Sequence, residues 1–150
     1  MNWLKMTRTF DAPREVVFNA WTDGKQMAKW FGPKGFTTEI TQHDARPGGL
    51  SLLVMRGPDG SEYPGKAIFR EILKPQRIVM TTFALKDGRE VLETLVTVTF
   101  EEKNSKTTLN LVVEIVKATD EAKPYTAGME EGWKQTLDKL GEVVTKSSGR

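Results

Sequence analysis

The sequence of 150 residues predicts an α+β fold: a curved antiparallel sheet of about seven strands, two short helices after the first strand, and a long C-terminal helix across the concave face. Residues 36–115 are rich in Thr, Val, Ile, Leu and Phe, and turn signals interrupt them at roughly 8–14-residue spacing. These signals lie at residues 47–49, 58–60, 74–75, 86–88 and 104–105. That spacing is typical of a meander of antiparallel strands. Helical periodicity is confined to the two ends of the chain, and this segregation of helices from strands is characteristic of α+β domains.

The N-terminal part of the chain predicts one strand followed by two short helices. Apolar and polar side chains alternate over residues 3–10, as in a half-buried strand. Pro13 suits the first turn of a helix over 13–21, whose apolar residues recur at three- and four-residue steps. A second helix over 25–30 is expected to end before Pro33.

The central stretch predicts six further strands. Val96, Val98 and Phe100 alternate with Thr97 and Thr99, so one face of the sheet is expected to be dry and the other wet. The expected strands cover residues 36–44, 49–56, 62–73, 77–85, 91–101 and 106–116.

The C-terminal segment predicts an amphipathic helix over residues 122–146. Gly128 and Gly132 lie one turn apart within it, and each costs about 1 kcal/mol relative to alanine. We therefore expect either a close approach to another surface or a fold in the helix at these glycines. Residues 1–146 are predicted to form a single domain, and residues 147–150 a flexible tail. The apolar positions of the helix are Met129, Trp133, Leu137, Leu140 and Val144.

Composition and charge narrow the classes of function. Lys and Arg number 22 against 20 Asp and Glu, and they are scattered among acids, which argues against a nucleic-acid partner. The chain has no cysteine, which excludes disulfides and cysteine-based sites and favours a reducing compartment. No apolar run resembles a signal peptide or reaches the ~20 residues of a membrane span. We therefore expect a cytoplasmic protein.

A cluster of large apolar residues predicts a ligand cavity between the sheet and the last helix. Three of the four tryptophans stand at the ends of expected elements, where such large side chains suit a built interior surface. Core packing is the better explanation for any single member, but the set and its methionines favour a cavity. The candidate lining residues are Trp21, Trp30, Phe31, Met55, Phe69, Phe83, Met129 and Trp133.

Polar residues near this cluster are candidates for orienting a ligand. Glu71 lies two residues beyond Phe69 on the expected inward face, so it joins the predicted ligand-binding set unless a β-bulge intervenes. Arg46 has the planar fork that binds a carboxylate or phosphate, but a pair with Asp44 at the turn is the favoured interpretation. The polar candidates are Arg46, Glu71, Thr81 and Tyr125.

The sequence shows no catalytic or metal-binding constellation. His43 is the only histidine, and no carboxylate cluster accompanies it at metal-ligand spacing, so a satisfied or exposed strand residue is the favoured interpretation. No G-x-S-x-G motif or phosphate-binding glycine loop is present. We therefore expect no metal and no cofactor, and an enzyme is the less favoured class.

Short motifs along nearly the whole chain resemble the START-like superfamily, also called SRPBCC or helix-grip. They are most similar to the branch that includes the C-terminal domain of the Aha-type activator of the heat-shock chaperone ATPase. Each motif alone is weak, but their common order is specific for the family and for no particular ligand. The motifs cover residues 8–13, 17–23, 30–33, 44–49, 65, 71–72, 75–79, 96–100 and 128–133, with Leu137 and Leu140.

The resemblance implies a sheet that grips the last helix around an apolar cavity for lipids, hormones, polyketides or other hydrophobic molecules. The first hypothesis is non-enzymatic binding of such a molecule, by a monomer or a homodimer. The second is a co-chaperone-like module that stimulates a heat-shock chaperone ATPase in the stress response, although these residues leave no room for the activator's further N-terminal domain. The third is an enzyme for a hydrophobic substrate, with Glu71, Arg46 or His43 as acid or electrostatic partner.

Overall fold

The computed structural model describes residues 3–147 and 149, which contain seven strands and four α-helices. The strands are β1 (Trp3–Phe10), β2 (Thr37–His43), β3 (Leu50–Arg56), β4 (Glu62–Leu73), β5 (Arg77–Lys86), β6 (Arg89–Lys103) and β7 (Lys106–Ala118). The helices are α1 (Arg14–Thr22), α2 (Gly24–Trp30), α3 (Lys123–Ala127) and α4 (Met129–Ser147), with a 3-10 turn, η1 (Asp120–Ala122), before α3. Of the predicted tail, Ser147 belongs to α4, and Ser148 and Arg150 lie outside the described residues.

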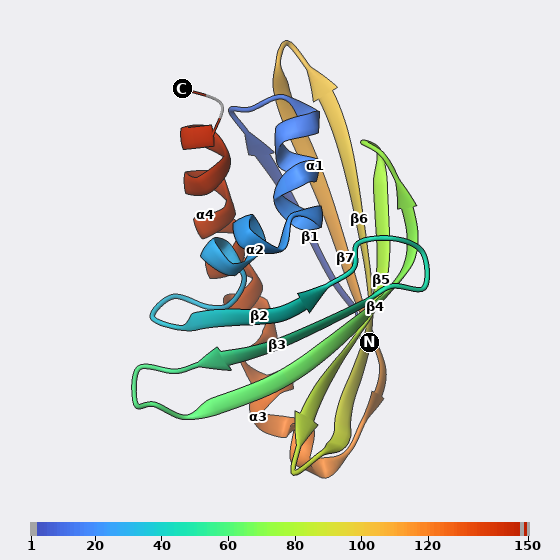
Figure 1. Ribbon diagram of the computed structural model, residues 1–150, viewed down its shortest axis with the longest axis vertical. Coiled ribbons are helices and arrows are strands. Elements are labelled where there is room, and N and C mark those ends of the chain that lie inside the picture. Colours follow the sequence, from blue (N-terminus) through green and yellow to red (C-terminus); the bar gives the residue numbers. More distant parts are fainter. Residues whose placement is uncertain (1–2, 148, 150) are drawn as a thin grey trace.

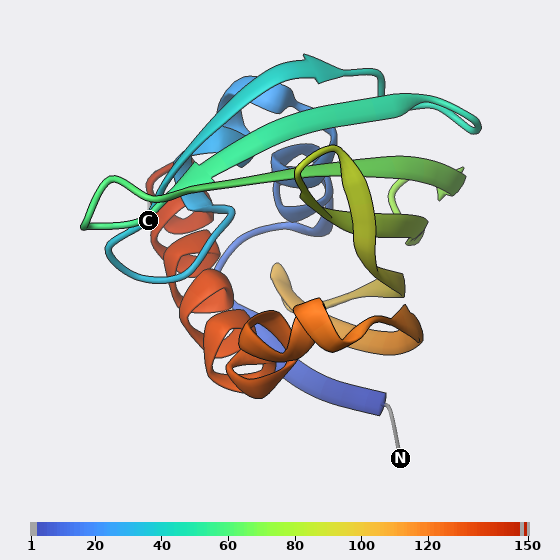
Figure 2. The same ribbon diagram turned by 90° about the horizontal axis from the view of Figure 1, so that it is seen from below.

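The strands form one antiparallel sheet in the order β1-β7-β6-β5-β4-β3-β2. Strands β2 to β7 follow one another as a meander, and β1 completes the sheet beside β7. The sheet curves around α4, while α1 and α2 cover one end of the same face and α3 lies at the other end (Figure 1, Figure 2). The predicted α+β fold and its helix-grip arrangement are confirmed.

The alternation predicted for β6 defines the buried face of the sheet. Val96, Val98 and Phe100 are at most 1% exposed, whereas Thr97 and Thr99 lie on the opposite, partly exposed face. Buried residues of β7, α1 and α4 complete the core under this part of the sheet: Leu109, Leu111, Val17, Phe18, Leu137, Leu140 and Val144.

The C-terminal helix is folded at Gly128, which separates α3 from α4. A Cβ atom at Gly128 would meet nothing within 4 Å, so this glycine does not serve a close approach. At Gly132 a Cβ would lie 3.7 Å from Pro33 Cγ, which is an ordinary van der Waals contact. Of the two expected reasons for the glycines, the fold in the helix is therefore the one that applies at Gly128. None of the described helices has the length and apolar character to cross a membrane.

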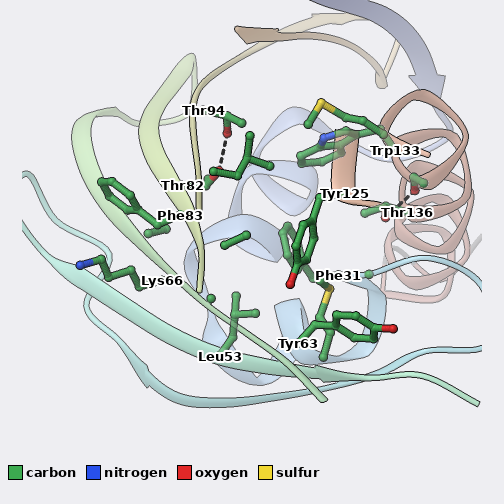
Figure 3. A pocket seen from close by; sticks show the side chains of 18 of the residues that line it. Phe31, Leu53, Tyr63, Lys66, Thr82, Phe83, Thr94, Tyr125, Trp133 and Thr136 are labelled. Atoms are coloured by element: carbon green, nitrogen blue, oxygen red, sulfur yellow. Dashed lines mark hydrogen bonds between the residues drawn. The ribbon is translucent and has the colours of Figure 1, made fainter. Parts of the chain in front are cut away.

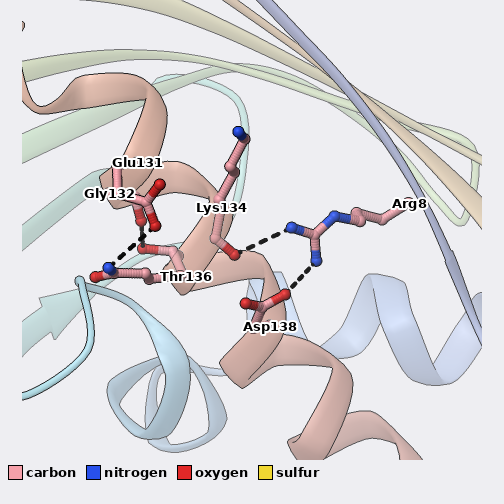
Figure 4. Close-up of polar contacts among 7 residues, drawn as sticks. Arg8, Glu131, Gly132, Lys134, Thr136 and Asp138 are labelled. Carbon is pink, nitrogen blue, oxygen red and sulfur yellow. Dashed lines mark hydrogen bonds and ion pairs between the residues drawn. The ribbon is translucent and has the colours of Figure 1, made fainter.

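Polar contacts on both flanks hold α4 in place over the sheet. On the β1 side, Arg8 Nη1 contacts Asp138 Oδ1 at 2.5 Å, and Arg8 Nη2 donates to the Lys134 carbonyl at 3.3 Å (Figure 4). On the other flank, Lys139 Nζ donates to the Gly32 carbonyl at 3.1 Å. These contacts tie α4 to β1 and to the segment that follows α2, so the helix forms a fixed wall.

Candidate functional site

A cavity of about 410 Å³ lies between the concave face of the sheet and the N-terminal half of α4. Strands β2 to β7 form its floor, α3 and α4 form one wall, and residues 31–36 form another (Figure 3). Most of the side chains that line it are apolar. They include Met27, Phe31, Phe36, Leu53, Met55, Phe69, Met80, Leu92, Val113, Met129 and Trp133.

Small residues on the inward face of the floor leave this space open. Gly65 pairs in register with Ala84 on one side and with Leu53 on the other, and Ala67 is the next inward residue of β4. Three of these four inward positions therefore carry at most one side-chain carbon. A larger residue at Gly65 would be crowded, because its Cβ would lie 3.1 Å from the Phe83 carbonyl oxygen.

Five residues at one level of the floor form a row that crosses five neighbouring strands. The strand register aligns His43 with Ser51, Ser51 with Ala67, Ala67 with Thr82, and Thr82 with Thr94. All five residues line the cavity. We call them the polar row, because they present an imidazole and three hydroxyls, with one methyl group at the centre.

His43 is held in one tautomer at the β2 end of the polar row. Its Nε2 lies 3.0 Å from the Trp21 carbonyl oxygen, which can only accept, so Nε2 carries the hydrogen. Nδ1 is then an acceptor, and the Ser51 hydroxyl donates to it at 2.8 Å. Burial lowers the pKa of His43 below 6.5, and the Trp21 carbonyl and the Asp23 charge offset part of that effect. The imidazole is therefore neutral at pH 7, and Ser51 is left with acceptor capacity alone.

Thr82 and Thr94 form a hydroxyl pair at the other end of the polar row. The two hydroxyls are hydrogen-bonded to each other across β5 and β6 (Figure 3). Thr94 is only 4% exposed, so bulk water has little access to it. Two hydroxyls bring two hydrogens, and one of these lies between the oxygens. The pair therefore keeps one O–H group that can donate a further hydrogen bond.

Aromatic rings line the sides of the cavity. Trp133 packs edge-to-face against Phe31, with ring centroids 5.9 Å apart, and stacks on Trp21 of the core at 6.4 Å. Towards α3, Tyr63 packs edge-to-face against Tyr125 at 6.1 Å. Burial raises the pKa of Tyr125 above 10.0, so its hydroxyl stays neutral at physiological pH. The walls therefore offer flat apolar surfaces and no charge.

Lys66 is the only described lining residue that carries a charge at neutral pH. Its Nζ pairs with Glu90 at 2.5 Å and lies 4.9 Å from the centre of the Phe83 ring. Lys66 and Phe83 are register partners that alternate with the inward residues Ala67 and Thr82, so both side chains belong to the outer face of the sheet. Figure 3 shows them set apart from the central group of lining residues. The charge is thus paired and lies outside the cavity.

The structure brings six of the predicted lining residues to the cavity and leaves two tryptophans out of it. Trp21 and Trp30 lie in the closed core, where their rings pack edge-to-face at 4.7 Å. The reason is that α1 and α2, which carry them, cover the packed end of the sheet rather than the open end. Five of the six turn their side chains toward the cavity, and the sixth, Phe83, borders it from β5 while its side chain lies on the outer face of the sheet. The five are Phe31, Met55, Phe69, Met129 and Trp133.

Glu71 does not face the cavity, although it was expected to continue the inward series of β4. A β-bulge between Phe69 and Glu71 shifts the register with β5, which reverses the facing of the residues beyond it. The Glu71 carboxylate is half exposed and pairs with Arg77 at 3.2 Å. It is therefore a surface ion pair rather than a buried acid.

The other polar candidates also divide between the cavity and positions away from it. Tyr125 borders the cavity. Arg46 pairs with Asp44 at 2.7 Å, as the favoured interpretation predicts. Thr81 lies on the outer face, where it accepts a hydrogen bond from Arg70 Nε at 3.0 Å.

Sequence reasoning missed most of the polar row. Ser51, Thr82 and Thr94 carry no motif, and His43 was interpreted as a satisfied strand residue without a link to the cavity. The available signal is the pairing across hairpins, because the predicted turns and strands already bring Thr82 opposite β6 and Ser51 opposite β2. Counting that register requires the positions of the bulges, and the sequence does not reveal them.

Comparison with known proteins adds a family and a set of similar folds. The family model described as Activator of Hsp90 ATPase homolog 1-like protein matches residues 11–145. Protein CV1439 from Chromobacterium violaceum is 27% identical, and its structure matches with a TM-score of 0.84 over 95% of this chain and 96% of that chain. Two further structures, each at 23% identity, share the fold. A protein from Arthrobacter aurescens matches with a TM-score of 0.88 over 97% of this chain and 87% of that chain. Protein Ms6760 from Mycobacterium smegmatis matches with a TM-score of 0.81 over 96% of this chain and 91% of that chain. No curated protein matches the sequence.

Proposed function

This chain belongs to the family of Activator of Hsp90 ATPase homolog 1-like proteins, and we propose that it acts as a non-enzymatic receptor for a small hydrophobic molecule. The observation that carries the proposal is the space of about 410 Å³ beneath the sheet. Ligand pockets range from about 300 to 1,000 Å³, whereas the voids of an ordinary packed core rarely exceed one water molecule. A space of this size therefore supports a ligand site rather than a packing defect.

The composition of the wall supports an apolar ligand. Burial of apolar surface contributes about 25 cal/mol per Å², so a ligand that buries a few hundred Å² gains several kcal/mol. After the cost of association, that gain corresponds to binding in the micromolar range. Met55 and Met129 border the cavity, and their flexible side chains adapt to ligands of different outline.

The proposal is tested by filling the cavity. Ala67 is buried at the centre of the floor, so Ala67→Leu projects three further carbons into the space. Ala118→Leu makes the same change at an exposed position of β7 and serves as the control. We expect Trp133 fluorescence and the melting temperature to respond to biphenyl, 1-decanol or indole in the wild type and in Ala118→Leu, and at least tenfold more weakly in Ala67→Leu. Equal responses in all three proteins, or none in the wild type, would contradict the proposal.

The family match favours one second candidate, a module that stimulates a heat-shock chaperone ATPase. A surface-acting module does not use the cavity, so Ala67→Leu should leave the stimulation unchanged. The measurement is ATP hydrolysis by a purified chaperone of the Hsp90 class with increasing amounts of the full chain. Stimulation that survives in Ala67→Leu, together with no ligand response in the wild type, would establish the second candidate in place of the first.

A further inference from the structure

We propose that the polar row selects an uncharged ligand that carries a hydrogen-bond donor at one end and an acceptor about 10 Å away. The donor would bind Ser51 Oγ, and the acceptor would bind the hydroxyl pair of Thr82 and Thr94. This inference rests on the proposed receptor function and defines the chemical class of its ligand.

The spacing follows from the strand register. Ser51 is on β3 and Thr82 on β5, and Ala67 of β4 stands between them in the same row. Neighbouring strands lie about 4.8 Å apart, so the two hydroxyl sites are separated by about 10 Å at the backbone. Because Ala67 contributes only a methyl group, the middle of the row leaves room for an apolar ligand body.

The polarity of each end follows from the hydrogen bonds already made. The Ser51 hydrogen is committed to Nδ1 of His43, whose own hydrogen is committed to the Trp21 carbonyl. Ser51 can therefore accept from a ligand but cannot donate to it. The hydroxyl pair has the opposite character, because one of its hydrogens is not used in any hydrogen bond of Thr82 or Thr94 within the described chain.

The exclusion of charged ligands follows from what surrounds the row. The rows on either side of it on the inward face are apolar, with Met80 and Val96 on one side and Ala84 and Leu92 on the other. The Lys66 ammonium is paired with Glu90 on the outer face. A carboxylate or an ammonium group on the ligand would thus be buried without a partner of opposite charge, which is strongly unfavourable.

A series of biphenyls tests the inference on the chain of residues 1–150. The probe with both groups is biphenyl with a hydroxyl at one para position and an acetyl group at the other, whose oxygens have a spacing similar to that of the row. The comparison compounds are biphenyl, the hydroxyl compound, the acetyl compound, and biphenyl para-carboxylate. Titration calorimetry gives each Kd.

We expect each neutral polar group to tighten binding about two- to twelvefold, in line with the net contribution of one hydrogen bond. The carboxylate should bind at least tenfold more weakly than the parent biphenyl.

In the double variant Thr82→Val and Thr94→Val, both hydroxyls are replaced by groups of similar shape, so no buried partner is left unpaired. In this double variant the gain in affinity from the ligand's acetyl group should vanish. The gain in affinity from the ligand's hydroxyl group, which binds Ser51, should remain. The control variant, Thr97→Val and Thr99→Val on the outer face of β6, should keep both gains.

The outcomes separate this inference from the receptor function. If biphenyl binds but all the neutral compounds have equal affinity, or if the carboxylate binds as tightly as biphenyl, the polar row does not select and the receptor function stands. An acetyl gain that survives in the Thr82 and Thr94 variant likewise overturns the assignment of the acceptor site. If no compound of the series binds, the receptor function and the inference are both contradicted.

Discussion

The two ends of the concave face are built from the same strands and the same helix, yet one is packed and the other hollow. At the packed end, β6 contributes Val98 and Phe100, and α1 closes the space with Phe18, whose ring lies 5.3 Å from that of Phe100. At the hollow end, the same strand contributes Thr94 opposite Thr82, and both border the cavity. The size of the inward residues therefore decides which end of the concave face is packed and which is hollow.

Helix α4 repeats this contrast along its own length. From Leu137 onward it packs Leu137, Leu140 and Val144 into the core, all fully buried. Its first two turns border the cavity with the small residues Gly132 and Thr136 beside the larger Met129 and Trp133. Because both the floor and the helix carry some small residues at the same end, the opening is a property of two elements that face each other. This coincidence distinguishes a built cavity from a single missing side chain.

The largest effect should come from deleting a ring at the packed end. Phe18→Ala removes a fully buried core side chain whose ring packs against Phe100, and we expect a loss of about 3–5 kcal/mol in the free energy of unfolding. The same change in Phe36, which is partly exposed beside the cavity, should cost about 1 kcal/mol. Urea denaturation of both variants measures the difference. Equal losses would show that the two ends are packed alike.

A smaller effect, of opposite sign in the two regions, should come from enlarging an alanine. Ala20→Leu in α1 forces a larger side chain into the closed core and should cost about 1–3 kcal/mol. Ala67→Leu places the same atoms in the cavity, and we expect stability between unchanged and about 1 kcal/mol higher. The two melting temperatures give the comparison. A clear loss of stability in Ala67→Leu would mean that the floor has no room for the added carbons.

The fold was largely predictable because its signals are local. The predicted turns contain Gly48, Gly60 and Gly88, and all three adopt positive φ angles of 82°, 86° and 76°, a conformation that glycine adopts without steric cost. The alternation in β6 likewise depends only on neighbours along the chain. Such features can be predicted from sequence because each depends only on the residue itself or on its neighbours along the chain.

The facing of individual residues was less predictable because it depends on bulges and on which helix covers which end. The bulge after Phe69 moves Glu71 to the surface, and another between Glu93 and Thr94 shifts the register of β6 with β7. Trp21 and Trp30 were expected at the cavity because aromatic rings suit a wall, but tertiary packing put them under the sheet's closed end. Patterns of single residues could therefore indicate a cavity without locating all of its lining.

The smallest effect that separates the two regions is a pH dependence at the hollow end. His43 is the only histidine, and burial lowers its pKa below the ordinary 6.5, so the folded state binds a proton less readily than the unfolded chain. The stability that this difference contributes is complete above pH 6.5 and is lost as the pH falls through the lowered pKa, because there the unfolded state takes up more protons. The variant His43→Gln should lack this decline. Urea denaturation of both proteins at intervals from pH 7.5 to pH 5.5 would show it, and parallel curves would mean that His43 is as solvated in the folded protein as in the unfolded one.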